Sequence, residues 1–499
     1  MKLFRVLLFV GVTTAAVAQT NAPQSQVISL QDCVQQALEN NLDLKIQRYN
    51  PVLSAYSVKS SQAGYDPGFS FSAQHNYNKS AGNSFDQNTG LPRPGSVSES
   101  DSLNSGLNGL LPWGMDYSLS GSFSESYGTS SGNRFDTGRG SVSANLTQPL
   151  LKNFWIDSTR LSIHVAKISL RQSELGLRNS IMNITTSTEN AYYDLIAAIE
   201  NVKVRQKALE LAERLLSENK KRVQVGALAP LDEKQAESQV ASARADLVSA
   251  RQSLASQQNI LKSLLTDDYV QLHNIELRPV ESLTAPVENF DLQQSWNNGM
   301  TLRPDLQQAK LDLERQGIQL KYDRNQLFPE LDVFGSYGYG AGGVNTVSFS
   351  DAFADIASRD LPSYSYGVSV SIPLSNRRAR YNYKSSKLSV EQALLTLKKL
   401  EQSILTQIDN AVIAARASYE RVDATRAARE YAEAALEAEQ KKLESGKSTS
   451  FFVLQLQRDL TAAQSSEIGA LADYNKALAN LALSEGTTLE RRNVVVEVK

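Results

Sequence analysis

The sequence predicts an α+β membrane protein in which β-barrel strands, four to six in each chain, are continued by a long α-helical coiled coil. Three observations predict this fold class: an export signal at the N-terminus, zones in which apolar and small polar residues alternate, and long heptad repeats. Alternation with a period of two is typical of β-strands, whereas apolar residues that recur every seven positions are typical of coiled-coil helices. We expect both kinds of element to occur twice, because the chain carries an internal duplication.

The composition excludes several classes of protein. The 499 residues contain 51 Lys and Arg against 53 Asp and Glu, which leaves no basic surplus for a nucleic-acid partner. Cys33 is the single cysteine, and His75, His164 and His273 lie far apart, so neither a disulfide framework nor a metal motif is expected. No nucleophile signature or phosphate loop is present, so we expect no cofactor and no enzymatic activity. Isolated Asp and Glu residues on the helices are expected to be solvated.

Residues 1–18 have the features of a cleaved signal peptide. Two basic residues precede an apolar run at 6–12, and an Ala-Val-Ala motif ends at Ala18. A membrane anchor is the alternative, although this run is too short to span about 30 Å of hydrocarbon. The mature chain is expected to start near Gln19.

The sequence contains two copies of one pattern. Leu30, Asp43, Leu44 and Pro67 recur as Leu292, Asp305, Leu306 and Pro329, an offset of 262 (292 − 30). Further along, Asn190 and Gly226 recur as Asn410 and Gly446, an offset of 220 (446 − 226). We therefore predict two structural repeats, at 19–281 and 282–487, followed by a C-terminal tail at 488–499.

Alternating residues fill one zone in each repeat, at about 67–150 and 329–374. The clearest example is 364–374, where tyrosines and aliphatic residues alternate with serines and other small residues. Strands of about ten residues with an apolar face and a small polar face suit a barrel with lipid outside and water inside. A soluble antiparallel sandwich with one wet face has the same period and is the alternative.

Prolines bracket these zones and predict the number of strands. The four prolines are Pro67, Pro149, Pro329 and Pro373. We interpret them as hinges between strands and helices, because proline suits strand ends and helix boundaries. The first zone is longer, so the first repeat is expected to supply four strands and the second repeat two. The alternative is two strands in the first repeat, with long loops at 79–102 and 128–140.

Two long antiparallel helix pairs are expected, at about 157–266 with a tip turn at 226 and at about 378–486 with a tip turn at 446. In the first pair, Leu or Val recurs every seven residues on each helix. The positions are Leu195, Val202, Leu209, Leu216 and Val223 on one helix, and Val240, Leu247, Leu254 and Leu261 on the other. At about 1.5 Å per residue, the longer helix would reach roughly 100 Å, enough to bridge a wide gap.

One chain has too few strands to close a water-filled barrel and too few long helices to enclose a hollow. Several copies around an axis would join the strands into one barrel and the helices into one hollow cylinder, without exposed sheet edges. The residues therefore favour a conduit. A soluble periplasmic coiled-coil adaptor without a barrel is the alternative, but it does not explain the serine-faced strands.

The chain resembles the TolC-like outer membrane efflux protein family over essentially its whole mature length. The matching stretches are 28–32, 37–41, 146–150, 371–374 and the tip turns at 222–232 and 442–454. The resemblance implies a homotrimer with an outer membrane barrel, a periplasmic helical tunnel and a mixed region near 266–300 that includes both termini. It also implies an exit duct of a tripartite efflux or type I secretion system, docked at its tips by a periplasmic adaptor that an inner-membrane transporter feeds.

The resemblance draws attention to three residues near the tips. The family commonly narrows its tunnel with acidic residues after the second tip glycine, where this chain has Phe452 and Gln455, so the acidic ring is not carried over. Asp232 stands where the family often has an acid that takes part in tip contacts. Our hypothesis is that Phe452 forms an apolar constriction that closes by dewetting. The alternative is that Phe452 merely packs between neighbouring helix pairs.

Five tip residues are candidates for contact with the adaptor. They are Val225, Gly226, Ala227, Gly446 and Lys447. The alternative is turn geometry alone, since a glycine after a helix supplies a left-handed cap whether or not a partner binds.

Overall fold

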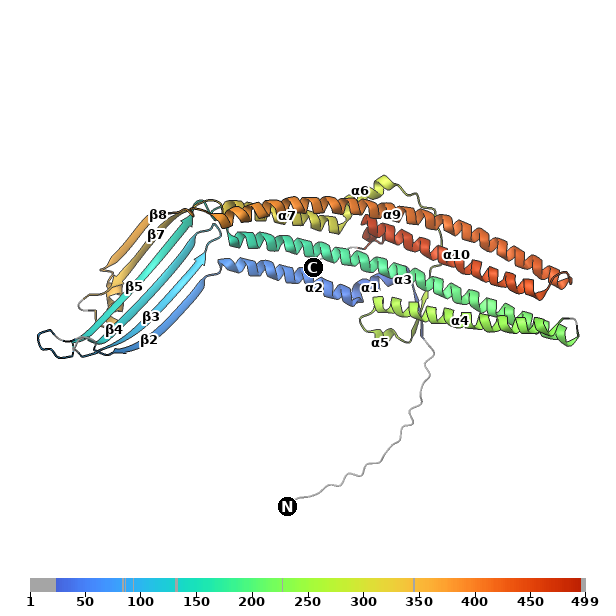
Figure 1. Cartoon of the computed structure of the whole chain (residues 1–499), viewed down its shortest axis with the longest axis horizontal. Coiled ribbons are helices and arrows are strands. Elements are labelled where there is room, and N and C mark those ends of the chain that lie inside the picture. The colour runs from blue at the N-terminus through green and yellow to red at the C-terminus, as the bar shows by residue number, and fades with distance from the viewer. Residues whose placement is uncertain are drawn as a thin grey trace, which may run out of the picture. The chain divides into compact units, whose positions relative to one another are not determined.

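The computed structural model describes residues 24–494 except 83, 84, 86, 93, 131, 132, 227, 344 and 345 (Figure 1). The predicted signal peptide at 1–18 lies outside the described residues. The chain divides into two compact units, and each unit draws on both sequence repeats. The helical unit comprises Met1–Ile46, Ser180–Leu302 and Thr406–Val496, and the sheet unit comprises Gln47–Asn179, Arg303–Leu405 and Glu497–Lys499.

Six strands form one antiparallel sheet in the sheet unit. They are β2 (Gly68–Ser80), β3 (Ser96–Leu110), β4 (Asp116–Ser130), β5 (Asn133–Pro149), β7 (Glu330–Ala341) and β8 (Pro362–Ser371). Their order is β2-β3-β4-β5-β7-β8, so β2 and β8 are the edges. The first repeat supplies four strands and the second supplies two. The alternative of two strands with long loops at 79–102 and 128–140 is wrong, because β3 begins at Ser96 and β4 and β5 occupy most of 128–140, although 81–95 do connect β2 to β3.

The strand register gives the sheet two different faces. The apolar face collects large side chains from neighbouring strands, as where Phe69, Leu107 and Leu119 lie opposite one another on β2, β3 and β4. The serine face carries small polar side chains, and the hydroxyl groups of Ser120 and Ser143 lie 3.0 Å apart across β4 and β5. Because side chains alternate along a strand, one sheet offers one surface to lipid and another to water.

Helices adjoin the sheet where its strands begin and end. α2 (Leu42–Gln62) and the short helix η1 (Ala63–Tyr65) lead into β2, α7 (Pro304–Asn325) leads into β7, and α8 (Phe349–Ser358) connects β7 to β8. The four prolines lie at such junctions: Pro67 precedes β2, Pro329 precedes β7, Pro149 ends β5 and Pro373 follows β8. Their action as hinges stays a prediction.

A buried amide fastens one of these junctions. Asn325, at the end of α7, is 5% exposed. Its Nδ2 donates to the carbonyl of Leu151 at 3.1 Å, and its Oδ1 accepts from the backbone N–H of Asn153 at 2.7 Å. Asn153 has a left-handed φ of 64°, a conformation that asparagine tolerates. The segment after β5 is thus tied to the helix of the second repeat that leads into β7.

Two antiparallel helix pairs account for most of the helical unit, and the first helix of each pair also contributes residues to the sheet unit. α3 (Ser158–Gln224) is followed by α4 (Pro230–Leu265), and α9 (Arg377–Glu444) by α10 (Ser450–Glu485). The smaller elements are β1 (Gln24–Ile28), which pairs in parallel with β6 (Ile275–Pro279), and α1 (Leu30–Asn40), α5 (Tyr269–Leu272), α6 (Leu292–Leu302) and α11 (Thr488–Arg491). Helix starts follow the sequence offsets, 262 for α1 and α6 (292 − 30) and 220 for α4 and α10 (450 − 230). Among the described residues, no helix combines the length and apolarity that a membrane crossing requires.

Heptad residues form the contact between α3 and α4. The buried cluster comprises Leu209, Ala212, Val240, Ala243 and Leu247. Small alanines alternate with larger residues there, so the two helices approach closely and their side chains interdigitate.

A second buried cluster surrounds the pair of β1 and β6 and includes Cys33, Tyr192 and Leu277. The hydroxyl of Tyr192 donates to Glu281, which also accepts from the backbone N–H of Leu30 at 3.2 Å and so caps α1. Burial raises the pKa of Tyr192, so the phenol keeps the proton that this bond requires.

We expect Cys33 to be unreactive in the folded protein. It is 0% exposed, and burial raises the pKa of its thiol to about 12, so almost no thiolate is present at about pH 8. Maleimide should leave native Cys33 unmodified and should modify it fully after denaturation. Ser445→Cys, at an exposed tip position, is the control that should react in the native protein. Fast labelling of Cys33 in the native wild type would contradict its burial.

Candidate functional site

Each helix pair ends in a turn that glycine makes possible. α3 continues into Val225 and Gly226, whose φ is 75°, and α9 continues into Ser445 and Gly446, whose φ is 73°. No heavy atom lies within 4 Å of a Cβ built on either glycine. A side chain would therefore have room at either position. Glycine is favoured because it adopts the left-handed conformation without strain.

The predicted docking residues lie on exposed surface at both tips. Val225 is 78% exposed, and Gly226, Gly446 and Lys447 are exposed as well. Ala227 lies outside the described residues. Docking needs such a surface, but the turn geometry accounts for the two glycines equally well, so adaptor contact stays a prediction.

The second tip has a complete set of backbone bonds. The N–H of Gly446 donates to the carbonyl of Leu443 at 3.1 Å, and the N–H of Lys447 donates to the carbonyl of Lys442 at 2.9 Å. This pair of bonds is a Schellman motif, which satisfies carbonyl groups at the end of α9.

Glu439 ties the same turn to α9. Its carboxylate accepts from the ammonium group of Lys442 at 2.8 Å and from the hydroxyl of Ser448. The bond from Lys442, followed by the bond from Ser448, lowers the pKa of Glu439 below its ordinary value. Our sequence analysis missed this contact, and the spacing of Glu439 and Lys442 on one helix was the only signal for it.

Asp232 connects the two helix pairs. It lies in the first turn of α4, where one carboxylate oxygen accepts from the N–H of Ala229 at 3.2 Å. The other oxygen accepts from the hydroxyl of Ser450 at 3.3 Å, and Ser450, at the start of α10, is 1% exposed. Asp232 therefore links the start of α4 to the start of α10.

An apolar cluster joins α3 to α9 and α10 near the tips. Its buried members are Leu215, Leu436, Leu443, Val453 and Leu454. The cluster draws on both repeats, so it packs the first helix pair of the chain against the second.

Phe452 and Gln455 lie on the exposed side of α10. Phe452 is 52% exposed, and its ring meets that of Phe451 edge to face, with centroids 5.7 Å apart. The next two residues, Val453 and Leu454, enter the apolar cluster instead. Phe452 is therefore outside the buried contact between the helix pairs of its own chain, and it is free to face a tunnel or a neighbouring copy.

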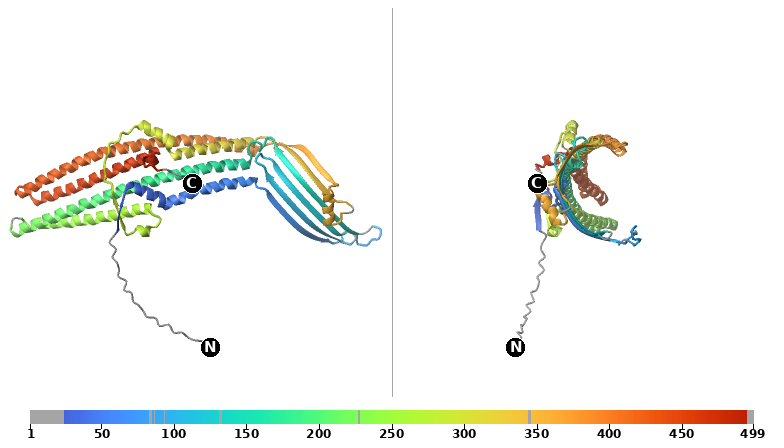
Figure 2. Two further views of the ribbon diagram at one scale, coloured as in Figure 1. Left: turned by 180° about the vertical axis from the view of Figure 1, so that it is seen from behind. Right: turned by 90° about the vertical axis from the view of Figure 1, so that its left-hand side faces the viewer.

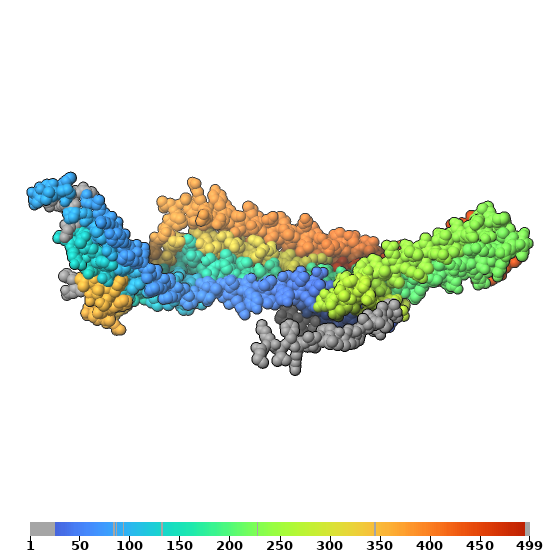
Figure 3. All heavy atoms as spheres, turned by 90° about the horizontal axis from the view of Figure 1, so that it is seen from below, coloured from blue at the N-terminus to red at the C-terminus, as the bar shows by residue number. Residues whose placement is uncertain are grey.

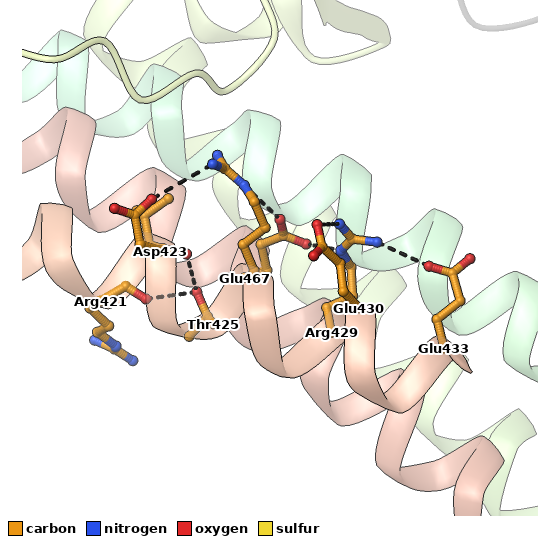
Figure 4. A network of polar contacts seen from close by, with 9 residues as sticks. Arg421, Asp423, Thr425, Arg429, Glu430, Glu433 and Glu467 are labelled. Atoms are coloured by element: carbon orange, nitrogen blue, oxygen red, sulfur yellow. Dashed lines mark hydrogen bonds and ion pairs between the residues drawn. The ribbon is translucent and has the colours of Figure 1, made fainter. Parts of the chain in front are cut away.

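A network of charges stiffens the pair of α9 and α10 (Figure 4). The guanidinium of Arg429 contacts Glu467 on α10 at 2.6 Å and Glu433 on its own helix at 3.0 Å. Arg426 contacts the same Glu467 at 3.8 Å. The Glu467 side chain is only 15% exposed, so the expectation that helix carboxylates are simply solvated is wrong here.

Comparison with known proteins identifies relatives of this chain. A family model described as outer membrane efflux protein matches residues 33–266 and 300–487. The pyoverdine export outer membrane protein OpmQ of Pseudomonas aeruginosa is 25% identical over 66% of this chain and 66% of its own length. The outer membrane protein TolC of Vibrio cholerae is 24% identical over 70% of this chain and 77% of that protein. The Campylobacter jejuni CmeC outer membrane channel has a TM-score of 0.67 at 17% identity, over 97% of this chain and 94% of that chain.

These findings separate the two fold hypotheses. The likeness to CmeC shows that the whole described fold, sheet and long helices together, is that of an outer membrane channel. A soluble coiled-coil adaptor would match only the helices. Because the family model covers most of its length, this chain belongs to the outer membrane efflux protein family and is a protein of the outer membrane with a large periplasmic portion.

Proposed function

We propose that this chain is the outer membrane exit duct of a tripartite efflux or type I secretion system, built from three copies. The two-faced sheet carries the proposal, because an apolar face suits lipid and a serine face suits a water-filled pore. The long helices would continue that pore into the periplasm. Transport would be passive, and its energy would come from an inner-membrane transporter.

Strand number and exposed side chains support the homotrimer. Porins with about 16–18 strands leave an aqueous channel, and the described residues of one chain supply a six-stranded sheet, so three copies would reach that number. Next to the sheet edges, α2 and α9 each leave a row of large apolar residues uncovered. The rows are Tyr49, Leu53 and Tyr56 on α2, and Tyr381, Leu388 and Leu395 on α9, each at least 60% exposed. Joining β8 of one copy to β2 of the next would bring such rows into contact.

Leu388→Glu should prevent the trimer from forming, because it places a carboxylate in an apolar contact between copies. Electrophoresis without heating should show the wild type as a trimer and this variant as a monomer. Lys387→Glu, also exposed and about 100° around the helix, is the matched control and should remain trimeric. A Leu388→Glu trimer as heat-resistant as the wild type would show that this row is not an interface.

Phe452 is our candidate for the tunnel constriction. It lies one helical turn from Gln455, and both residues are on the side of α10 that the apolar cluster leaves free. Apolar rings that converge from three copies would close a narrow pore by dewetting, without an acidic ring. Packing of Phe452 against a neighbouring copy is the competing interpretation.

Phe452→Ala should raise the conductance of the closed channel, because it removes three rings from the narrowest point. Single-channel recording in a planar bilayer measures this change directly. Phe451→Ala removes the adjacent ring, which is similarly exposed at 47%, and is the control that should leave the closed state nearly unchanged. If Phe452→Ala leaves the closed-state conductance unchanged, the constriction hypothesis fails.

The tips are the proposed contact with the periplasmic adaptor. Their exposed residues surround two turns of fixed geometry, which suits recognition by a partner protein. Opening would be an iris-like shift of the tip helices that this contact favours.

Cysteines at Val225 and Lys447 should crosslink to the cognate adaptor when both proteins are co-expressed. Tyr431→Cys is the control. Tyr431 is 77% exposed but lies on α9 before the tip, so this cysteine should crosslink much less. Immunoblotting of the crosslinked products gives the measurement. Equal crosslinking at Tyr431, or none at either tip, would count against docking at the tips.

A further inference from the structure

A short helix that the sequence patterns do not predict lies against the apolar face of the sheet. α8 packs over β4, β5 and β7, and in the right-hand view of Figure 2 it lies outside the curve of the sheet. In Figure 3 the corresponding yellow-orange atoms project beside the strands. The ring of Phe353 stacks on that of Phe123 of β4, with centroids 4.0 Å apart, and Ala352 is fully buried. α8 is therefore packed onto the sheet and is not a free loop.

Two glycines of β5 make room for α8. A Cβ on Gly138 would lie 2.8 Å from the carbonyl oxygen of Ser348, and a Cβ on Gly140 would lie 2.9 Å from the ring of Phe123 and 3.2 Å from Ile356. Gly140 lies opposite Phe123 in the register, so its missing side chain belongs to the apolar face. A larger residue at position 138 would crowd the backbone at the start of α8, and one at position 140 would crowd Ile356 and the Phe123 ring on which α8 packs.

Polar bonds fix the start of α8 over β4. The N–H of Ser348 donates to the carboxylate of Asp351 at 3.1 Å, and the hydroxyl of Ser348 accepts from the N–H of Asp351 at 3.3 Å, which makes a capping box. The N–H of Phe349 donates to the carboxylate of Glu125, on β4, at 3.2 Å. The N–H groups of Phe349 and Asp351 at the start of α8 thus have protein partners. The side of α8 away from the sheet can contact solvent or lipid.

α8 lies at the level where the apolar face gives way to charge. Gly140 is nine residues from Pro149, the helix-side end of β5 (149 − 140), and a strand needs about 9–11 residues to cross the hydrocarbon of a membrane. Between the helix-side end of the sheet and the level of Gly140, the apolar face carries large residues such as Leu107 and Leu119. At that level Asp101 lies opposite Glu125 on the same face.

α8 has two distinct sides. One side carries Phe349, Ala352, Phe353 and Ile356, and the other carries Ser350, Asp351, Ala354, Asp355 and Ser358. The first side faces the sheet: Ala352 is buried, and the ring of Phe353 stacks on Phe123 while remaining 51% exposed. Because the apolar side packs on the sheet, α8 offers its polar side to its surroundings, and a polar side suits lipid headgroups and not hydrocarbon.

We propose that α8 is an interfacial helix that contacts the lipid headgroups of the outer leaflet and so sets how deeply the sheet is inserted. The covered strands β4, β5 and β7 are all interior, whereas a neighbouring copy would join at the edges β2 and β8. The position of α8 thus fits a lipid surface and not a second copy. The proposal rests on insertion of the sheet into the membrane, which belongs to the proposed function.

Depth measurements in the full-length trimer test this assignment. Cys33 is buried, so single introduced cysteines can be labelled with a fluorophore in phosphatidylcholine vesicles. Ala354→Cys reports on α8, Leu119→Cys on the apolar face, and Leu91→Cys on the connection between β2 and β3. Lipids that carry a nitroxide either at the headgroup or within the acyl chain quench labels at the corresponding depth.

The label at Ala354 should be quenched mainly by the headgroup nitroxide, the label at Leu119 mainly by the acyl nitroxide, and the label at Leu91 by neither. Quenching at Ala354 that resembles Leu91 would overturn the proposal, since α8 would stand in water or under another protein. Quenching that resembles Leu119 would overturn it as well. An unquenched label at Leu119 would overturn membrane insertion itself, and with it the proposed function.

Gly140→Val, introduced with the Ala354 label, should displace α8 and abolish most of the headgroup quenching. Gly335→Val is the matched control, because Gly335 lies on the same face opposite Leu146 and has no heavy atom within 4 Å of its Cβ position. Phe353→Ala is the milder variant if Gly140→Val fails to assemble. Undiminished quenching in both α8 variants would show that this packing does not hold the helix at the interface.

Discussion

The alternation of side chains along six strands is the constraint on which the rest of the structure depends. It gives each chain a sheet that is apolar on one face and lined with serines on the other, as at Phe69 and Ser120. Such a sheet has two edges, β2 and β8, whose backbone groups lipid cannot solvate, so pairing with further copies would satisfy them. In the proposed assembly, the helices that enter and leave the sheet of each copy would surround the same axis as the strands.

Sequence patterns predicted those parts of the fold whose side chains repeat with a single period. The strand at 364–374 and the helix starts near 158 and 230 could be predicted because alternation or heptads persist through them. Alternation was hidden in the halves of β3 and β5 that lie away from the helices, where Glu99 and Asp101 on β3 and Arg134 and Asp136 on β5 replace apolar residues on the apolar face. Charged residues on this face are expected where a strand has left the hydrocarbon. The loss of alternation therefore marks the point at which the strand leaves the membrane.

The features of the tips were likewise predictable where they depend on local sequence and unpredictable where they depend on contacts between distant residues. Gly226 and Gly446 could be predicted from sequence, because a glycine after a long heptad indicates a left-handed cap. The bond from Ser450 to Asp232 joins positions 218 apart in the sequence, and no local pattern encodes such a contact. α8 escaped prediction for the same reason: its ten residues are too few for a convincing period, and its place depends on glycines of β5.

The contacts within one chain constrain how the tips can move. Heptad residues join α3 to α4, and the apolar cluster around Leu443 joins α3 to α9 and α10. Each buried Leu or Val contributes about 1.5–3 kcal/mol, whereas a single hydrogen bond such as that of Ser450 to Asp232 contributes about 0.5–1.5 kcal/mol. Separating the two helix pairs of one chain would therefore cost far more than breaking the polar link between them. We therefore expect an iris-like opening to move both pairs of a chain together and to change contacts between copies. Phe452, which is 52% exposed in one chain, is available for such contacts.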